Sequence, residues 1–182
     1  MPTSKEGEKL IKIANSSLRK AFEGKGVNSL NPKSSKLDKK SGAFVTLYLN
    51  GELRGCIGFI ESDLPLWKSV AEASRLSAFE DPRFPPLKKE ELGQVKFEIS
   101  VLTPTTKIEG DALQKVKVGR DGLIIEHAGK SGLLLPQVAT ENGWNAEEFL
   151  EQTCIKAGLN PGAWKEKGCK IYKFQAQIFS EK

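Results

Sequence analysis

A cysteine between two glycines is the feature of this sequence with the clearest potential for chemistry. It lies in a run of six residues: Leu53, Arg54, Gly55, Cys56, Ile57 and Gly58. Glycine on both sides lets a ligand or another stretch of backbone come close to the sulfur. An arginine two residues upstream favours the thiolate, which is the reactive form of cysteine. The run therefore predicts a thiol-centred site at Arg54 and Cys56, in which the sulfur acts as a nucleophile, a redox group or a ligand for a soft metal.

The alternative interpretation is structural, because free cysteine is among the residue types most often buried. Asn50 and Gly51 precede the run and are typical of a tight hairpin turn after an apolar strand. Such a turn places Val45 opposite Cys56, among apolar side chains. It also places Arg54 and Cys56 on one face of the second strand, with α-carbons about 6.5–7 Å apart. An unpaired guanidinium is costly to bury, which favours the functional interpretation of this pair.

A proline-rich run at 81–86 is the second candidate motif. Its three prolines end the predicted helix before it, and Asp81 with Arg83 is expected to form an ion pair within a rigid turn. The functional alternative is that this run forms a stiff wall beside Cys56. If the thiol reacts, Arg54 and a carboxylate such as Glu98 are the expected helpers.

The chain offers few other partners for a catalytic thiol or a metal ion. His127 is the only histidine, and no Cys-x-x-Cys pair is present. A Cys–His dyad and a zinc site of the Cys/His kind are therefore both disfavoured, and no metal site is predicted. His127 is expected to be exposed at the end of a hairpin, and the two further cysteines, Cys154 and Cys169, are expected to be structural.

The charge of the chain is mildly basic. Its 182 residues include 28 basic and 23 acidic ones, for a net charge of +5 and a pI near 9.0. This excess permits contact with nucleic acid but does not require it. The polar segment 25–42 holds five of the lysines and is expected to be a solvated linker. The alternative is a basic arm for phosphate backbones, although the segment lacks the interleaved aromatic residues on which bases stack.

The expected location is the cytoplasm. The first residues lack the apolar core of a secretory signal, and no apolar stretch approaches the length of a membrane span. Three cysteines form no even disulfide framework, so free thiols in a reducing cytosol are expected. No contact with a membrane is predicted.

The remaining pattern combines hairpins with separate helices. Helical spacing follows the capping motifs at Thr3 and Asn145, and strict alternation marks strands at 95–102 and 171–179. A second hairpin joins 123–127 to 132–135. These elements predict an α+β fold with a mostly antiparallel sheet. No glycine-rich dinucleotide loop and no phosphate-loop lysine motif occurs, so the residues name no cofactor.

The run at 53–58 resembles the hallmark hexapeptide of the AMMECR domain family, named for a human chromosomal region linked to Alport syndrome. Further blocks in the same order resemble this family: 44–47, 78–87, 98–102, 121–125, 135–139 and 143–144. The resemblance implies a larger lobe, residues 1–104 and 165–182, with an antiparallel sheet, packed helices and both termini. It also implies a smaller inserted α+β lobe, residues 105–164.

The resemblance implies no settled activity. It suggests basic roles in transcription, replication, repair or translation, and an association with Memo-type proteins or radical S-adenosylmethionine proteins. Gln137 and Trp144 lie in matching blocks and are expected to line a cleft between the lobes, unless Trp144 simply packs in a core. The hypotheses are an enzyme or enzyme partner with a thiol-centred cleft at Arg54 and Cys56, a factor that binds nucleic acid or protein, and a purely architectural hexapeptide.

Overall fold

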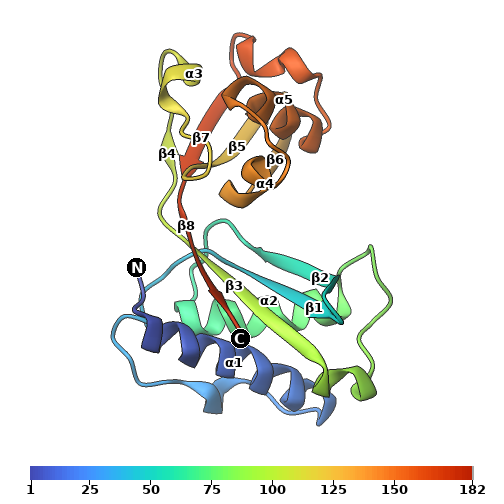
Figure 1. The fold of residues 1–182 in the computed structure, drawn as a ribbon. Helices are drawn as coiled ribbons and strands as arrows, with labels where there is room; N and C mark the ends of the chain where they lie inside the picture. Colours follow the sequence, from blue (N-terminus) through green and yellow to red (C-terminus); the bar gives the residue numbers. More distant parts are fainter. Residues whose placement is uncertain (182) are drawn as a thin grey trace. The chain divides into compact units, whose positions relative to one another are not determined.

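The computed structural model describes residues 1–181 and divides into two compact units (Figure 1). The first unit combines Met1–Leu102 with the segment that begins at Gln177, and the second contains Thr103–Ala176. Each unit has its own four-stranded sheet, and helices pack against both sheets. The predicted α+β class with antiparallel sheets is confirmed. The lobe boundaries that the family resemblance implied stay a prediction.

The first unit is built on a sheet with strand order β2-β1-β3-β8. Its strands are β1 (Ala43–Leu49), β2 (Glu52–Phe59), β3 (Val95–Leu102) and β8 (Ala176–Ser180). Its helices are α1 (Ser4–Phe22) and α2 (Leu66–Phe79), with short 3₁₀ turns η1 (Asn28–Leu30) and η2 (Lys89–Gly93). Both helices pack against one face of this sheet, where they enclose the core of the unit (Figure 1).

Small residues let α1 and α2 approach each other closely. The Ser17 hydroxyl on α1 donates to the carbonyl of Ala71 on α2 at 2.7 Å, and the Ser74 hydroxyl on α2 donates to the carbonyl of Ala14 at 3.0 Å. The capping box predicted at Thr3 is present at the start of α1. Within residues 1–181, no helix is long and apolar enough to cross a membrane.

The segment 25–42 is not the solvated linker that its composition predicted. Leu37 is fully buried in the core of the first unit, and Val27 is 9% exposed. The carbonyls of Leu37 and Lys39 accept hydrogen bonds from the first amides of α2, at 3.2 and 2.9 Å. Two isolated apolar residues are enough to fasten a polar segment, but they produce no periodic signal. We call residues 25–40 the strap.

The second unit has a sheet with strand order β4-β7-β5-β6. Its strands are β4 (Thr106–Lys107), β5 (Gly122–His127), β6 (Lys130–Leu134) and β7 (Lys170–Phe174). Its helices are α3 (Ala112–Lys115), α4 (Pro136–Glu141) and α5 (Ala146–Lys156), with the 3₁₀ turn η3 (Pro161–Lys165). The predicted β5–β6 hairpin and the capping box at Asn145 are confirmed, and α5 packs against β5 and β6.

The single closing strand predicted at 171–179 was wrong. The segment forms two strands, β7 and β8, which belong to different sheets. Ile171 and Phe174 are the buried residues of β7, so strict alternation fails before the strand ends. Gln175 separates the strands, and its amide and carbonyl are both hydrogen-bonded to Thr103, at 2.8 Å each.

Candidate functional site

The candidate hexapeptide lies on β2, which is an edge strand of the first sheet. The predicted turn before it is present, with positive φ at both Asn50 (54°) and Gly51 (86°), as a two-residue turn of type I′ requires. Leu53, just after this turn, is 38% exposed. The turn therefore sets the start of the register as expected.

A β-bulge next to Leu47 then changes which residues face each other, because Arg54 is an extra residue without a partner on β1. A shift of one residue moves every later side chain to the other face of a sheet. Cys56 pairs with Thr46 instead of Val45, so the predicted register was wrong at this point. The thiol lies on the face away from α1 and α2 and is not part of the apolar core.

Cys56 is half-buried, and its environment keeps the thiol protonated. Its Sγ lies 3.2 Å from the Thr46 Oγ1, and either atom can be the donor. Burial raises the pKa of the Cys56 thiol above its ordinary value. The Thr46 hydrogen bond and the charge of Arg83 lower this pKa by less, and the carboxylates of Asp81 and Glu98 add to the rise. Cys56 is therefore a neutral thiol at neutral pH.

The Arg54 guanidinium is held by groups other than Cys56. Its Nε and Nη2 donate to the two carboxylate oxygens of Glu91, at 2.9 and 3.1 Å. Its Nη1 and Nη2 also donate to the carbonyls of Pro85 and Pro86, at 2.9 and 3.3 Å. The side chain is only 11% exposed, and the ion pair lowers the pKa of Glu91. Arg54 thus ties β2 to the segment before β3.

Asp81 and Arg83 form the predicted ion pair, and this pair lies against the backbone of Cys56. The Arg83 Nε and Nη2 donate to the Asp81 carboxylate at 2.9 and 2.7 Å. Asp81 also accepts the amide of Cys56 at 2.9 Å, and Arg83 Nη2 donates to the carbonyl of Cys56 at 3.4 Å. These bonds hold the pKa of Asp81 well below its usual range. We call this arrangement the Asp81–Arg83 clasp.

The two glycines of the hexapeptide serve close packing. A Cβ at Gly55 would collide with the carbonyl oxygen of Ser77 on α2, and one at Gly58 would collide with the backbone of β1. The Ser77 hydroxyl accepts the amide of Ile57 at 2.8 Å and donates to the carbonyl of Val45 at 2.7 Å, so it bridges β2 and β1. Sequence reasoning missed this role, because a serine within a run of small helical residues gives no sign of a bond to a strand.

Glu98 completes a row of polar side chains across the sheet. Thr46 pairs with Cys56 on one side and with Glu98 on the other, so all three lie on the same face. The Glu98 carboxylate accepts a hydrogen bond from Ser180 on β8 at 3.0 Å. Its charge raises the pKa of Cys56 and therefore opposes formation of a thiolate. We call Cys56, Thr46 and Glu98 the polar row.

The other predicted site residues lie in the second unit. Gln137 is on α4, and its Oε1 is buried without a hydrogen-bond partner among the described residues. Trp144 packs against the core of this unit. Cys154 is fully buried in the same core, where burial raises its pKa to about 11, and Cys169 is half-buried beside it. The cleft predicted for Gln137 and Trp144 stays a prediction.

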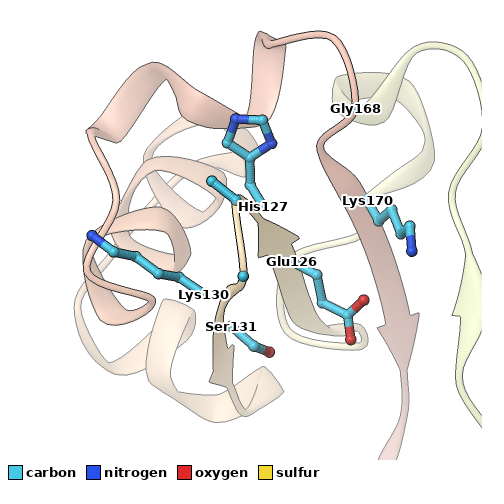
Figure 2. Close-up of a pocket in the computed structure, with 8 residues that line it drawn as sticks. Glu126, His127, Lys130, Ser131, Gly168 and Lys170 are labelled. Carbon is cyan, nitrogen blue, oxygen red and sulfur yellow. The ribbon is translucent and has the colours of Figure 1, made fainter.

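A pocket of about 420 Å³ opens at the end of the β5–β6 hairpin (Figure 2). His127 lines it, but its Nε2 is 2.9 Å from a carboxylate oxygen of Glu166. The hairpin end at 128–130 is exposed as expected, and the His127 side chain itself is half-buried. Lys130 is also engaged, because its Nζ donates to the carbonyl of Gly158 at 2.7 Å. In Figure 2, His127, Lys130 and Glu126 point in different directions, so they do not converge on one ligand.

Metal binding and cysteine–histidine catalysis each need a group of side chains that neither unit assembles in the part of the chain that the structure describes. No three His, Cys, Asp or Glu side chains of residues 1–181 are grouped to hold a metal ion. The first unit, which contains Cys56, has no histidine, because His127 belongs to the second unit. The groups present around Cys56 are a neutral thiol, a hydroxyl, the guanidinium of Arg83 and the carboxylates of Asp81 and Glu98, which together suit hydrogen bonding and ion pairing.

The chain is similar in sequence to a known protein family and to several archaeal proteins. The AMMECR1 family matches residues 11–179. Protein NEQ441 of Nanoarchaeum equitans is 46% identical over 177 residues, which cover 94% of this chain and 98% of the relative. Protein MK0488 of Methanopyrus kandleri is 44% identical over 187 residues, which cover 98% of this chain and 90% of the relative.

A solved structure shows the same fold. The crystal structure of protein PH0010 from Pyrococcus horikoshii, described as uncharacterised, matches with a TM-score of 0.91 and 45% sequence identity. The match covers 97% of this chain and 91% of that one. Because sequence and fold agree over almost the whole length, the chain belongs to the AMMECR1 family.

Proposed function

We propose that the protein acts as a binding factor and that Cys56 works as a protonated thiol within its recognition surface. The observation that carries this proposal is that the Arg54 guanidinium is bound by groups other than Cys56. This guanidinium is bound to Glu91 and two carbonyls, and the pKa of Cys56 is raised by burial. A thiol enzyme needs the opposite arrangement, with a lowered pKa and an adjacent base.

The surface around Cys56 is fixed by hydrogen bonds and includes the half-exposed guanidinium of Arg83. The Asp81–Arg83 clasp holds both backbone polar groups of Cys56, and the guanidinium of Arg83 stacks over the ring of Phe84 at 5.4 Å. The Arg83 side chain is nevertheless 50% exposed. The Arg83 Nε and Nη2 are engaged by Asp81 and by the carbonyl of Cys56, which leaves Nη1 to donate a charge-assisted hydrogen bond to a carboxylate. The ligand proposed for this surface is an acidic group of a partner protein.

The family resemblance supports a protein ligand, since the Memo-type and radical S-adenosylmethionine proteins that it suggested as associates are themselves proteins. A rigid surface also binds with little loss of conformational entropy, which favours recognition of a preformed partner. A thiol-dependent enzyme would have a reactive Cys56, whereas a binding factor would not. The alkylation rate of Cys56 therefore separates the two hypotheses.

The test is the pH dependence of Cys56 alkylation by iodoacetamide in a Cys154→Ala, Cys169→Ser background. If the protein is a binding factor, the Cys56 thiol should show an apparent pKa above the ordinary cysteine value of about 8.5, and its alkylation should be slow at neutral pH. A rate at pH 7 well above that of a free cysteine peptide would overturn the proposal and restore the enzyme hypothesis.

The ligand class has a separate test. An acidic tetraglutamate peptide, labelled for fluorescence anisotropy, is titrated with the wild type, with Arg83→Gln and with Arg75→Gln. Arg75 is a matched control, because its side chain is 43% exposed and lies on α2. Loss of peptide binding in Arg83→Gln alone supports the assignment. Equal binding by the two variants contradicts it.

A further inference from the structure

The positive charge of this chain is concentrated in its first 40 residues. They contain ten basic and four acidic residues, for a net charge of +6, whereas the whole chain carries +5. The remaining 142 residues are therefore close to neutral, with a net charge of −1. These first residues form α1 and the strap, so the excess lies on two neighbouring elements of the first unit.

On α1, four lysines share one line along the helix. Lys5, Lys9, Lys12 and Lys20 are spaced four, three and eight residues apart, with Ser16 midway in the last interval. Positions three or four residues apart lie on the same side of a helix, so these side chains form a continuous stripe. The opposite side of α1 is buried in the core. We call these four residues the α1 lysine stripe.

The strap lies beside this stripe. The Ser34 hydroxyl donates to the carboxylate of Glu6 on α1 at 3.3 Å, and the Lys36 Nζ lies 3.7 Å from the same carboxylate. Figure 1 shows the chain after α1 running back along the helix. Because Leu37 is fully buried, the strap is anchored to the first unit, and its lysines Lys33 and Lys39 are exposed.

The lysines of this surface form no close ion pair among the described residues, although Lys20 acts electrostatically on Glu23 and the exposed Glu8 lies between Lys5 and Lys12. Lys5, Lys9, Lys12, Lys20, Lys33 and Lys39 form no ion pair with any other residue that the structure describes within 1–181. A row of unpaired like charges repels itself, so a bound polyanion would relieve that repulsion. We propose that the α1 lysine stripe and the strap bind the phosphate backbone of a nucleic acid.

Shape and composition favour nucleic acid over a membrane surface. From Lys5 to Lys20 the helix rises about 22 Å, at about 1.5 Å per residue, which spans roughly six base pairs of a duplex. A helix that binds lipid inserts an apolar face into the headgroups. The apolar face of α1 is instead buried under α2 and β3. The surface has no aromatic side chains for stacking on bases, so binding is independent of sequence.

The test is fluorescence anisotropy over a range of salt concentrations. The labelled probes are a duplex DNA and a duplex RNA of about 20 base pairs and a single-stranded RNA of about 20 nucleotides. The stripe variant carries Lys5→Gln, Lys9→Gln, Lys12→Gln and Lys20→Gln. The control variant carries four substitutions on exposed lysines of the second unit, Lys117→Gln, Lys156→Gln, Lys167→Gln and Lys170→Gln. Both variants lose the same net charge, and glutamine retains the helix propensity of lysine.

We expect the stripe variant to bind at least about tenfold more weakly than the control variant at low salt. Its slope of log K against log salt on duplex DNA should be smaller by up to about 3.6, because each of the four phosphate contacts contributes about 0.9. The three probes identify the kind of nucleic acid bound. Equal weakening of the two variants, or no binding by the wild type to any probe, would overturn the inference. A wild type that binds only anionic lipid vesicles would also overturn it.

This inference stands apart from the proposed function of the Cys56 surface. Alkylation of Cys56 should be the same in the stripe variant and in the wild type, because none of the four substituted lysines contributes to the pKa of that thiol. A reactive Cys56 would therefore end the first proposal and leave the second intact.

Discussion

Cys56 faces Thr46 across β2 and β1, with 3.2 Å between Sγ and Oγ1. This pairing depends on the bulge at Arg54, since an unbulged hairpin would turn the thiol toward Val45 and the apolar core. The same bulge leaves Arg54 off the regular ladder and in contact with Glu91. Arg54 and Gly55 therefore fasten β2 to its surroundings, while Cys56 is presented on the other face.

The first prediction concerns the hydrogen bond between these two residues. Thr46→Val removes the hydroxyl that lowers the pKa of Cys56 and leaves the burial that raises it. We expect the thiol pKa to rise further and alkylation at mildly alkaline pH to slow. The measurement is the pH–rate profile with iodoacetamide when Cys56 is the only cysteine. Thr140→Val, an exposed change on α4, is the control, and a faster reaction in Thr46→Val would contradict the prediction.

The second prediction separates the two arginines near the hexapeptide. Arg83→Gln removes a charge that lowers the pKa of Cys56, so this pKa should rise. Arg54→Gln should leave the thiol pKa unchanged but destabilise the protein by about 3 kcal/mol, because it breaks a largely buried ion pair with Glu91. The checks are alkylation profiles and denaturant unfolding of both variants. If Arg54→Gln changes the pKa of Cys56 more than Arg83→Gln does, then Arg54 is the residue that stabilises the Cys56 thiolate, as the sequence predicts.

Local signals predicted most of the fold. The capping boxes at Thr3 and Asn145, the Asn50-Gly51 turn and the ion pair of Asp81 with Arg83 are all present. Each of them is determined by residues close together in the sequence, where propensity and hydrogen-bond geometry decide the outcome. The α+β class followed from counting such elements.

Features that depend on distant contacts were not predicted. The bulge at Arg54 is stabilised by Glu91, 37 residues away, so the hairpin sequence alone does not reveal it. Leu37 is an isolated apolar residue in a polar segment, and only its burial in the core shows that it anchors the strap. The change of sheet at Gln175 likewise depends on hydrogen bonds to Thr103.

The third prediction is a pH dependence of stability that comes from Asp81. Its pKa is lowered in the folded protein by Arg83 first and then by the amides of Cys56 and Arg83, although burial opposes the shift. A carboxyl with a lowered folded pKa stabilises the fold at pH values above its unfolded pKa of about 3.9, and the stabilisation is lost as the pH falls below that value. Asp81→Asn should therefore cost about 2–3 kcal/mol at neutral pH.

The cost of Asp81→Asn should shrink steadily as the pH falls below about 4, because the Asp81 carboxyl of the unfolded wild type then takes up a proton while the folded form stays ionised. Denaturant unfolding at a series of pH values measures both proteins. Asp63→Asn is a control, because Asp63 pairs with Lys40 at the exposed surface and its loss should leave stability nearly unchanged. A cost for Asp81→Asn that is constant from neutral pH to pH 3 would show that the charge of Asp81 is not what stabilises the clasp.

The fourth prediction tests whether the glycine before Cys56 is required by packing. Gly55→Ala should destabilise the protein by about 1–3 kcal/mol, because its Cβ meets the backbone carbonyl of Ser77 and α2 must move. Gly93→Ala is the matched control: no heavy atom lies within 4 Å of its Cβ position, so stability should change by less than about 0.5 kcal/mol. Equal costs in denaturant unfolding would mean that β2 and α2 are not held in close contact. A large cost at Gly55 alone explains this glycine by helix packing, without any ligand at that position.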